Sequence, residues 1–304
     1  MTEWRETVAA ILGAPGVVML LGHVNVGKTT VATDVANAAV RAGRPPAVVD
    51  ADPGQSDIGP PTTVGLGMVD RPVRQMLQVP LAAAYFAGDT SAQYAQRWVV
   101  DGAERLVARA RQLGASIVIV DTAGWVEGPA AVAARVREIR RIAPRHVIAI
   151  QRADEVEPIL TRVAGEAAVH RLRPAADARR RSPRERRAFR ELQFSRYFRE
   201  ARRATLDLAS VRAEREVAHA GRTIAPGRVL DALPPEALRH RLIGLAAETG
   251  DLVGLATIVA ARPGERAVDL IAPADAVARA RVLQWGAVRV APDGREERRA
   301  AGAA

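Results

Sequence analysis

Residues 17–30 read VVMLLGHVNVGKTT, and they contain the strongest indication of the fold. The first five, Val17 to Leu21, form a short apolar run that is typical of a buried strand. From Gly22 the chain satisfies G-x-x-x-x-G-K-[ST], a loop whose backbone N–H groups surround nucleotide phosphates. An alanine- and valine-rich helix is expected over 28–42. The succession of strand, phosphate loop and helix predicts a P-loop α/β domain.

Lys28 is the only lysine among the 44 basic residues of the chain, and all the others are arginines. A compact ammonium is the group that reaches the β- and γ-phosphates of a nucleotide in this kind of loop. We therefore expect Lys28 to take part in phosphate chemistry and the Thr29 hydroxyl to ligate Mg²⁺. The predicted nucleotide-binding set is Gly22, Asn25, Val26, Gly27, Lys28, Thr29 and Thr30.

Three more apolar runs alternate with helical patterns in the first half of the chain. The runs are residues 47–50, 117–121 and 146–150, and helices are expected near 92–113, 129–142 and 154–164. Strands that alternate with helices indicate a doubly wound parallel sheet, which binds ligands at the carboxyl ends of its strands. The phosphate loop follows one of these carboxyl ends, as the rule requires.

The pattern changes after residue 150. Residues 171–203 hold 13 arginines against four acids, and residues 223–293 are strand-like and rich in turns. We therefore expect an arginine-rich helical lid followed by a small, mainly β C-terminal domain. The predicted domains are a P-loop domain with its lid over 1–205 and the mainly β domain over 206–304.

The composition favours a soluble cytoplasmic protein. The net charge of +10 is concentrated in residues 171–203, which indicates a polyanionic partner or, alternatively, a solvated basic helix. The absence of cysteine excludes a disulfide framework and thiolate chemistry. No apolar run reaches the roughly 18 residues of a membrane span, and the N-terminus lacks the features of a secretory signal. We expect no membrane partner, and no feature identifies a protein partner.

Carboxylates follow two of the predicted strands. Asp121 ends the strand over 117–121, from which it could hold a metal ion, although a helix N-cap is an alternative. The strand over 47–50 leads into Asp50-Ala51-Asp52-Pro53-Gly54-Gln55 beside the phosphates. We assign Asp50 and Asp121 to the metal, Asp52 to a general base and Gln55 to orientation of the nucleophile. A polar turn around Pro53 is the alternative.

A capping box, Ser182-Pro183-Arg184-Glu185, begins a helix inside the arginine-rich segment. Arg186 and Arg190 are four residues apart and therefore share one face of this helix. Such arginines suit a mobile lid that closes over transferring phosphates and neutralises the charge that develops there.

The run from Asp50 to Thr63, DADPGQSDIGPPTT, resembles the polynucleotide 5′-hydroxyl kinases of the RNA-processing type, especially their compact archaeal and bacterial forms. In that P-loop NTPase family a D-x-D-x-x-Q segment runs into a Pro-Pro turn. A T-x-G-W clasp follows the third strand and is matched here by Thr122-Ala123-Gly124-Trp125. Arg181, Arg186 and Arg190 resemble the spacing of the family's lid arginines. The resemblance is specific from Gly22 to about Phe198.

The resemblance implies an ATP-dependent kinase that uses Mg²⁺ and phosphorylates 5′-OH ends of RNA, DNA or both. Asp52 would deprotonate the 5′-hydroxyl, with Gln55 beside it. Thr122, Gly124 and Trp125 would help to position the γ-phosphate and the substrate. The lid arginines would stabilise the transition state.

Two other functions compete with the kinase. A GTPase-type switch or assembly factor would explain D-x-x-G at Asp121–Gly124, and Gln151–Asp154 stands where N-K-x-D would bind guanine. Gln151 and Arg152, however, lack the Asn and Lys of that motif. A non-catalytic ATP-binding scaffold in RNA processing fits the same residues and differs from the kinase only in turnover.

Overall fold

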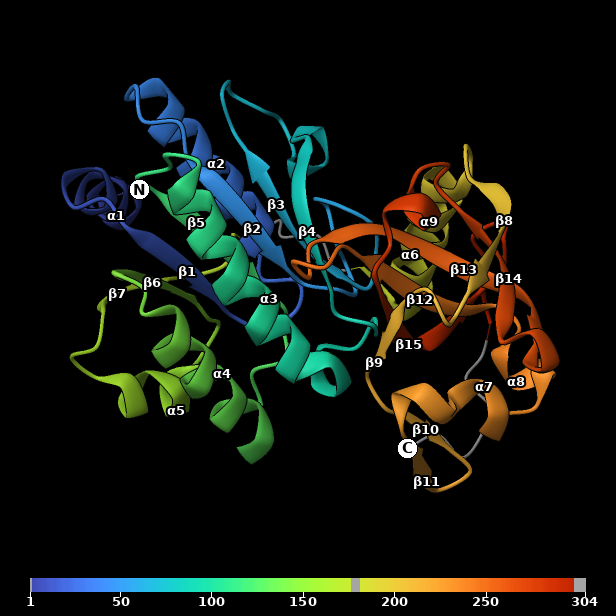
Figure 1. Cartoon of the computed structure of the whole chain (residues 1–304). Coiled ribbons are helices and arrows are strands. Elements are labelled where there is room, and N and C mark those ends of the chain that lie inside the picture. Colours follow the sequence, from blue (N-terminus) through green and yellow to red (C-terminus); the bar gives the residue numbers. More distant parts are fainter. Residues whose placement is uncertain (1, 176–180, 298–304) are drawn as a thin grey trace. The chain divides into compact units, whose positions relative to one another are not determined.

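The computed structural model describes residues 2–175 and 181–297, which fall into two compact units (Figure 1). The first unit comprises Met1–Gly59, Thr63–Ala84 and Ser91–Ser182. The second comprises Pro60–Thr62, Tyr85–Thr90 and Pro183–Ala304. The domain boundary expected after residue 205 stays a prediction.

A seven-stranded sheet forms the centre of the first unit, in the order β4-β3-β2-β5-β1-β6-β7. Strands β2, β5, β1, β6 and β7 are parallel, and β3 is antiparallel to β2. The predicted parallel sheet is therefore confirmed. The strands are β1 (Val17–Leu21), β2 (Ala47–Ala51), β3 (Thr63–Met68), β4 (Leu81–Phe86), β5 (Val118–Thr122), β6 (His146–Ile150) and β7 (Ala168–Leu172).

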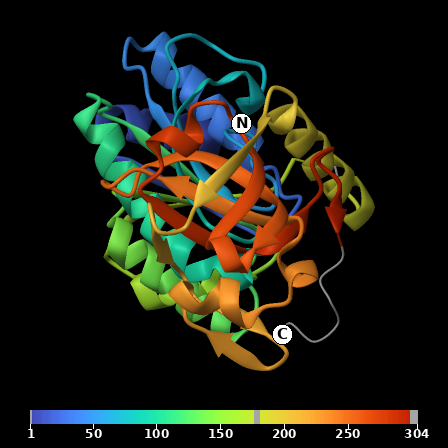
Figure 2. The same cartoon turned by 45° about the vertical axis from the view of Figure 1, so that its right-hand side comes forward.

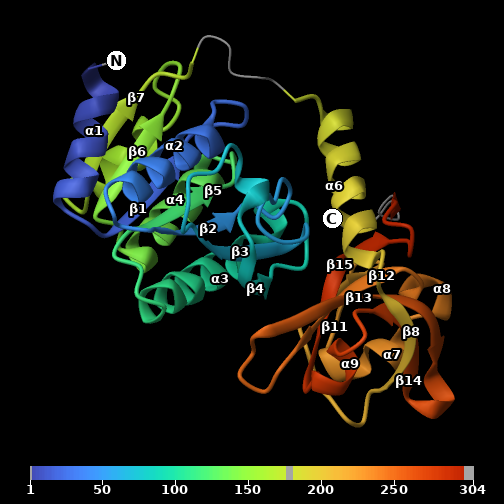
Figure 3. The ribbon, with the colours of Figure 1, turned by 90° about the horizontal axis from the view of Figure 1, so that it is seen from above.

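Helices cover both faces of this sheet (Figure 3). Val18 and Leu20 of β1 pack in the same cluster as the apolar residues of α2, while Met19 and Leu21 point to the opposite face. All four side chains are fully buried, so neither face of β1 meets solvent. The helices of this unit are α1 (Thr2–Gly13), α2 (Lys28–Arg41), α3 (Ala92–Gln112), α4 (Pro129–Ile142) and α5 (Glu157–Leu160), with 3₁₀ turns at Met76–Gln78 and Thr161–Val163.

One helix is shorter than the sequence pattern predicted. The helix expected near 154–164 consists of the four residues of α5 followed by the 3₁₀ turn. Pro158 lies at the start of α5, and Gly165 adopts a positive φ of 81° just after the turn. Because proline favours a helix start and a left-handed glycine ends one, only a short helical segment fits between them.

The second unit is mainly β, as predicted (Figure 2). Its seven-stranded sheet has the order β16-β15-β12-β13-β14-β8, with β9 also paired to β15. The strands are β8 (Arg202–Asp207), β9 (Arg212–Glu214), β12 (Arg241–Ala246), β13 (Leu252–Arg262), β14 (Ala267–Ala272), β15 (Val282–Val290) and β16 (Glu296–Glu297). A separate hairpin is formed by β10 (Val217–His219) and β11 (Arg222–Ile224).

Helix α6 (Pro183–Phe198) begins at the proline of the predicted capping box. Its Phe194 and Phe198 side chains are buried in a cluster with Phe86, Leu242 and Leu255 of the same unit. The remaining helices are short: α7 (Val229–Ala232), α8 (Pro235–Leu238), α9 (Ala276–Arg279), and 3₁₀ turns at Pro226–Arg228 and Pro263–Glu265. The aromatic residues of the arginine-rich segment therefore anchor α6 to the second unit.

Within the described ranges, no helix is both long and apolar enough to cross a membrane. The cytoplasmic location expected from the composition stays a prediction.

Candidate active site

The phosphate loop connects the end of β1 to the start of α2. Asn25 and Gly27 have positive φ angles of 61° and 88°, so the chain turns sharply before the first helical residue. A side chain at Gly22 would not fit, because its Cβ would lie 2.4 Å from the Ile150 carbonyl oxygen. The first N–H groups of α2 consequently open onto the loop, where a helix N-terminus attracts anions.

Lys28 is buried inside this loop, with 8% of its surface exposed. Its Nζ donates hydrogen bonds to the carbonyl oxygens of Gly22 (3.0 Å) and His23 (2.9 Å). Burial lowers the pKa of Lys28, and the carboxylates of Asp121 and Asp52 oppose this shift. The ammonium thus lies in a concave loop with negative charge behind it, which suits a group that binds phosphate oxygens.

Thr29 and Asp121, the two residues predicted to ligate Mg²⁺ from the motif and the strand end, are joined by a hydrogen bond. The Thr29 hydroxyl donates to Asp121 Oδ2 at 2.6 Å, and Asp121 lies in β5 rather than at a helix N-cap. Burial raises the pKa of Asp121 to about 6, against the lowering effects of Lys28 and Thr29. Hydroxyl and carboxylate oxygens are the ligands that Mg²⁺ prefers. The described residues contain no group of three or more His, Cys, Asp or Glu that could hold a metal ion.

Both carboxylate oxygens of Asp50 accept hydrogen bonds from backbone N–H groups of the loop that follows β2. Its Oδ1 accepts from Asp52 N (3.1 Å), and its Oδ2 accepts from Asp57 N (2.6 Å) and Ile58 N (3.0 Å). Burial, together with the nearby Asp121 and Asp57 carboxylates, raises its pKa well above the usual value. These bonds give Asp50 a structural function, and its predicted metal role stays a prediction.

Only one carboxylate oxygen of Asp52 accepts hydrogen bonds from the described residues. Its Oδ1 accepts from Gly54 N (3.0 Å) and Gln55 N (3.2 Å), and the turn predicted around Pro53 is therefore present. Its Oδ2 accepts no hydrogen bond from the part of the chain that the structure describes, and the side chain is partly exposed. One carboxylate oxygen thus remains available for a substrate proton. Gln55 Oε1, beside it, accepts from Arg181 Nη1 at 3.4 Å.

The clasp residues lie against the phosphate loop. The Thr122 hydroxyl donates to the Leu20 carbonyl oxygen at 2.6 Å and is buried in the sheet. Gly124 packs on Val24 so closely that a Cβ would lie 2.5 Å from Val24 N. The Trp125 carbonyl oxygen accepts from Arg135 Nε at 3.2 Å. The clasp is thus held by β1, the phosphate loop and α4, and the Trp125 side chain takes no part in these three contacts.

The lid arginines divide between the two units. Arg181 belongs to the first, where its backbone N–H donates to Asn25 Oδ1 at 3.2 Å. Arg186 and Arg190 lie on α6 in the second. Arg190 forms a bidentate ion pair with Glu296, in which its Nη2 is 2.8 Å from Oε2. The catalytic roles predicted for Arg186 and Arg190 stay predictions.

Sequence reasoning missed two features of this site. Arg135 and Glu138 of α4 form a buried ion pair, with 3% and 1% exposed, and Arg135 also lowers the pKa of Lys28. Asp57 is partly exposed, and burial together with the Asp52 carboxylate raises its pKa to about 6, against the lowering effect of Arg181. The i,i+3 spacing of Arg135 and Glu138 could have indicated the pair, whereas no sequence signal marks Asp57.

The segment Gln151–Asp154, which stands where N-K-x-D would bind guanine, forms a hydrogen-bonded turn of its own. Gln151 Nε2 donates to Glu157 Oε1 (2.7 Å), and Gln151 Oε1 accepts from Val156 N (3.2 Å). Arg152 Nη2 donates to the Asn25 carbonyl oxygen at 3.0 Å. The Gln151 carboxamide is therefore already used within its own turn.

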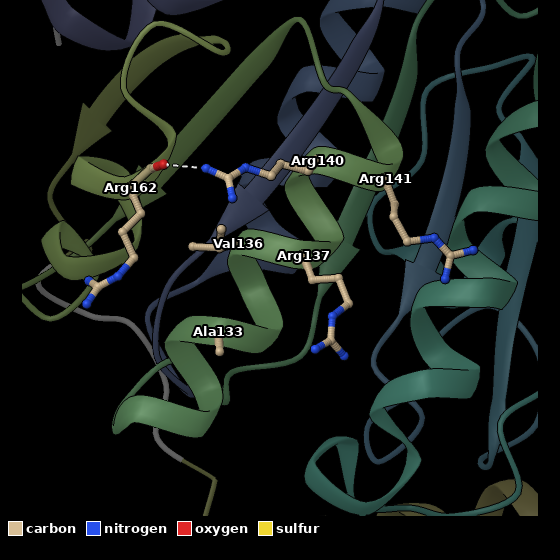
Figure 4. Close-up of a pocket in the computed structure, with 6 residues that line it drawn as sticks. All are labelled: Ala133, Val136, Arg137, Arg140, Arg141 and Arg162. Carbon is tan, nitrogen blue, oxygen red and sulfur yellow. Dashed lines mark hydrogen bonds between the residues drawn. The ribbon is translucent and has the colours of Figure 1, made fainter.

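A shallow hollow elsewhere in the first unit is not the candidate site (Figure 4). Four arginines surround a small apolar floor on α4, but Arg140 pairs with Glu166, and Arg141 pairs with Asp101 and Glu104. Its charge is largely neutralised, and none of the predicted site residues lines it. The lining residues are Ala133, Val136, Arg137, Arg140, Arg141 and Arg162.

Known proteins resemble this chain over most of its length. The sequence model of the mRNA cleavage and polyadenylation factor CLP1 P-loop family matches residues 22–200. The polyribonucleotide 5′-hydroxyl-kinase of Pyrococcus furiosus is 27% identical over 94% of this chain and 90% of its own length. That of Methanocaldococcus jannaschii is 31% identical over 61% of this chain and 51% of its own length. A solved structure of a wild-type Clp1p–Pcf11p complex shares the fold, with a TM-score of 0.68 at 12% identity over 95% of this chain and 78% of that one.

Proposed function

We propose that this chain, which belongs to the CLP1 P-loop family, is an ATP-dependent polynucleotide 5′-hydroxyl kinase. It transfers the γ-phosphoryl group of ATP to the 5′-OH end of RNA, DNA or both. Curated archaeal relatives that carry the name polyribonucleotide 5′-hydroxyl-kinase support this reaction, and the RNA in their name favours RNA as substrate. Mg²⁺ and ATP are the cofactors that the residues of the site fit.

One observation carries the proposal: the phosphate loop and the segment with Asp52 follow two parallel strands, β1 and β2, that flank β5 in the sheet. In the sheet register, Asp121 of β5 is the partner of Leu20 of β1 on one side and of Asp50 of β2 on the other. The phosphate loop follows β1, and Asp52 follows β2. Because the carboxyl ends of parallel strands share one edge of the sheet, the phosphate loop and the turn with Asp52 begin at the same edge, and the Asp52 carboxylate is close enough to raise the pKa of Lys28.

The chemistry follows from these positions. Asp52 Oδ2 accepts the proton of the substrate 5′-hydroxyl while that oxygen forms a bond to the γ-phosphorus. The bond from the γ-phosphorus to the β–γ bridging oxygen breaks, and Lys28 neutralises the charge that develops there. Mg²⁺ held by Thr29 and by Asp121, directly or through water, would supply further charge neutralisation. Trp125 and the arginines 181, 186 and 190 are proposed to hold the acceptor end and the transferring group.

The GTPase-type switch is not favoured, because the Gln151 carboxamide is occupied within its own turn. A non-catalytic ATP-binding scaffold differs from the kinase in turnover alone. Transfer of labelled γ-phosphate from ATP to 5′-OH RNA and DNA oligonucleotides therefore tests the proposal directly. Label at the 5′ end supports the kinase. Tight ATP binding without transfer would establish the scaffold instead, and hydrolysis that prefers GTP would establish the switch.

Two pairs of variants locate the activity. Lys28→Ala is expected to abolish transfer, whereas Arg137→Ala removes an equal charge from an exposed position of α4 and is expected to retain it. Asp52→Asn should leave ATP affinity nearly intact and lower turnover by about 10²-fold or more, the effect of a lost general base. Asp70→Asn, at an exposed carboxylate of the same unit, is its control. Equal rates in Asp52→Asn and wild type would reduce Asp52 to a turn residue.

A further inference from the structure

Asn25 makes a contact that nucleotide binding alone does not explain. Its Oδ1 accepts from the backbone N–H of Arg181 (3.2 Å), and its Nδ2 donates to the carbonyl oxygen of the same residue (3.5 Å). The two bonds join residues 156 positions apart in the sequence. The carboxamide of Asn25 therefore pairs with both the N–H and the carbonyl group of Arg181, as the backbone of a neighbouring strand would.

The conformation of Asn25 makes this contact informative. With a φ of 61°, the residue lies in the left-handed region, where glycine is the least strained choice. Asparagine tolerates that region better than most residues, and its carboxamide offers one donor and one acceptor side by side. Both bonds exist only with the carboxamide in the orientation observed. The residue type thus fits a position that needs a tight turn and a grip on a peptide group.

The side chain of Arg181 extends toward the turn that contains Asp52 and Gln55. Its Nη1 lies 3.4 Å from Gln55 Oε1, and its charge lowers the pKa of Asp57, a carboxyl group whose pKa the Asp52 carboxylate raises. The backbone of Arg181 is therefore held by Asn25 of the phosphate loop, while its side chain reaches Gln55 in the turn that contains Asp52, the proposed general base. The chain then enters α6 at Pro183.

We propose that Asn25 is a positioning residue that holds Arg181 at the acceptor site for phosphoryl transfer. The inference rests on the proposed kinase function and adds a coupling between its two substrate sites. Asn25 acts through Arg181, so its loss should impair use of the polynucleotide more than binding of ATP. A residue that only shaped the phosphate loop would instead affect ATP first.

The chain contains a matched control for this contact. Asn37 on α2 forms the same pair of bonds with Val73: Nδ2 donates to its carbonyl oxygen and Oδ1 accepts from its N–H, both at 2.8 Å. Asn37→Ala removes a chemically equal clamp in the same unit, at a helical position that alanine tolerates. Asn25→Gly removes the clamp at a φ that glycine adopts without strain.

The experiment measures steady-state phosphorylation of a 5′-OH RNA oligonucleotide at saturating ATP, together with ATP affinity and melting temperature. We expect Asn25→Gly to lower kcat/KM for the oligonucleotide about tenfold, the scale of two lost neutral hydrogen bonds. ATP affinity should stay within about threefold of wild type. Asn37→Ala should alter the melting temperature without this kinetic change.

A double variant separates positioning from a general structural effect. If Asn25 acts through Arg181, Asn25→Gly combined with Arg181→Ala should be no slower than Arg181→Ala alone. Additive losses, or an equal loss in Asn37→Ala, would overturn the inference while leaving the kinase proposal intact. A fall in ATP affinity that matches the kinetic loss would overturn it as well. Absence of label transfer by the wild-type protein would instead overturn the proposed function, and the positioning role with it.

Discussion

Replacing Gly124 by alanine tests how closely the clasp packs on the phosphate loop. The added Cβ would lie 2.5 Å from Val24 N, 2.6 Å from Val24 Cγ1 and 2.8 Å from Val24 Cα. Ordinary contact for such an atom begins at 3.4 Å, so the two backbones must separate by about 0.9 Å. Two of the three obstructing atoms belong to the backbone, and a side-chain rotation cannot remove the clash.

Gly124→Ala is expected to lower both the stability and the turnover of the protein. Forcing one methyl group into a packed contact lowers the free energy of unfolding by about 1–3 kcal/mol. Displacement of the loop by close to 1 Å misplaces the groups that orient the phosphates, and a shift of that size can lower turnover about 10²-fold. Gly124→Ala should therefore lose more activity than its loss of stability alone would explain at a temperature where it remains folded.

Chemical denaturation and label transfer, measured on the same preparations, check this prediction. Gly13→Ala is the matched control, since it lies in the same unit at the end of α1, has no neighbouring atom within 4 Å of its Cβ and lacks a left-handed φ. It should change the free energy of unfolding by no more than about 0.5 kcal/mol. If Gly124→Ala unfolds and phosphorylates as the wild type does, the clasp does not pack on the phosphate loop as described.

Three further substitutions test buried polar groups by chemical denaturation. Asp50→Asn places an NH₂ group against backbone N–H donors and should lower the free energy of unfolding by about 1–3 kcal/mol; an unchanged value would show that those bonds contribute nothing. Arg135→Met leaves Glu138 buried without its partner and should cost about 3–5 kcal/mol, whereas Arg135→Met with Glu138→Leu should recover much of this loss. Tyr197→Phe deprives Leu255 N of its acceptor at 2.7 Å and should cost about 1–3 kcal/mol, and wild-type stability would contradict the contact.

The elements that the sequence predicted well are those set by local signals. The strand before the phosphate loop and the helix after it follow from one motif, and β6 matches the apolar run at 146–150 residue for residue. Strands β3 and β7 were missed for different physical reasons. A Cβ at Gly65 of β3 would lie 1.8 Å from the Ile58 carbonyl oxygen. Close tertiary packing therefore requires glycine in this strand, and glycine is not a residue that indicates a strand in a sequence. β7 is a partly exposed edge strand whose polar residues hide the usual alternation.

The site shows the same division. Thr29 and Asp121 were predicted from motif and strand end, and the structure joins them by one hydrogen bond, although their metal role stays a prediction. The direction of the Thr122 hydroxyl, which points to the Leu20 carbonyl oxygen, could not be predicted, because a residue type does not determine its rotamer. The i,i+3 spacing of Arg135 and Glu138 is compatible with their ion pair, but the burial of the pair depends on how α4 packs, which no local pattern encodes.

Asp50 and Asp52 show why spacing alone could not assign the base. Two positions apart, they would share a face of an extended strand, but β2 ends at Ala51 and Asp52 already belongs to the turn. Both oxygens of Asp50 accept backbone N–H groups, and a proton delivered there would displace at least one of those bonds. Asp52 uses only Oδ1 in its turn, and its Oδ2 accepts no hydrogen bond from the described residues. A general base must gain a proton without dismantling its own loop, and of the two carboxylates only Asp52 meets that condition.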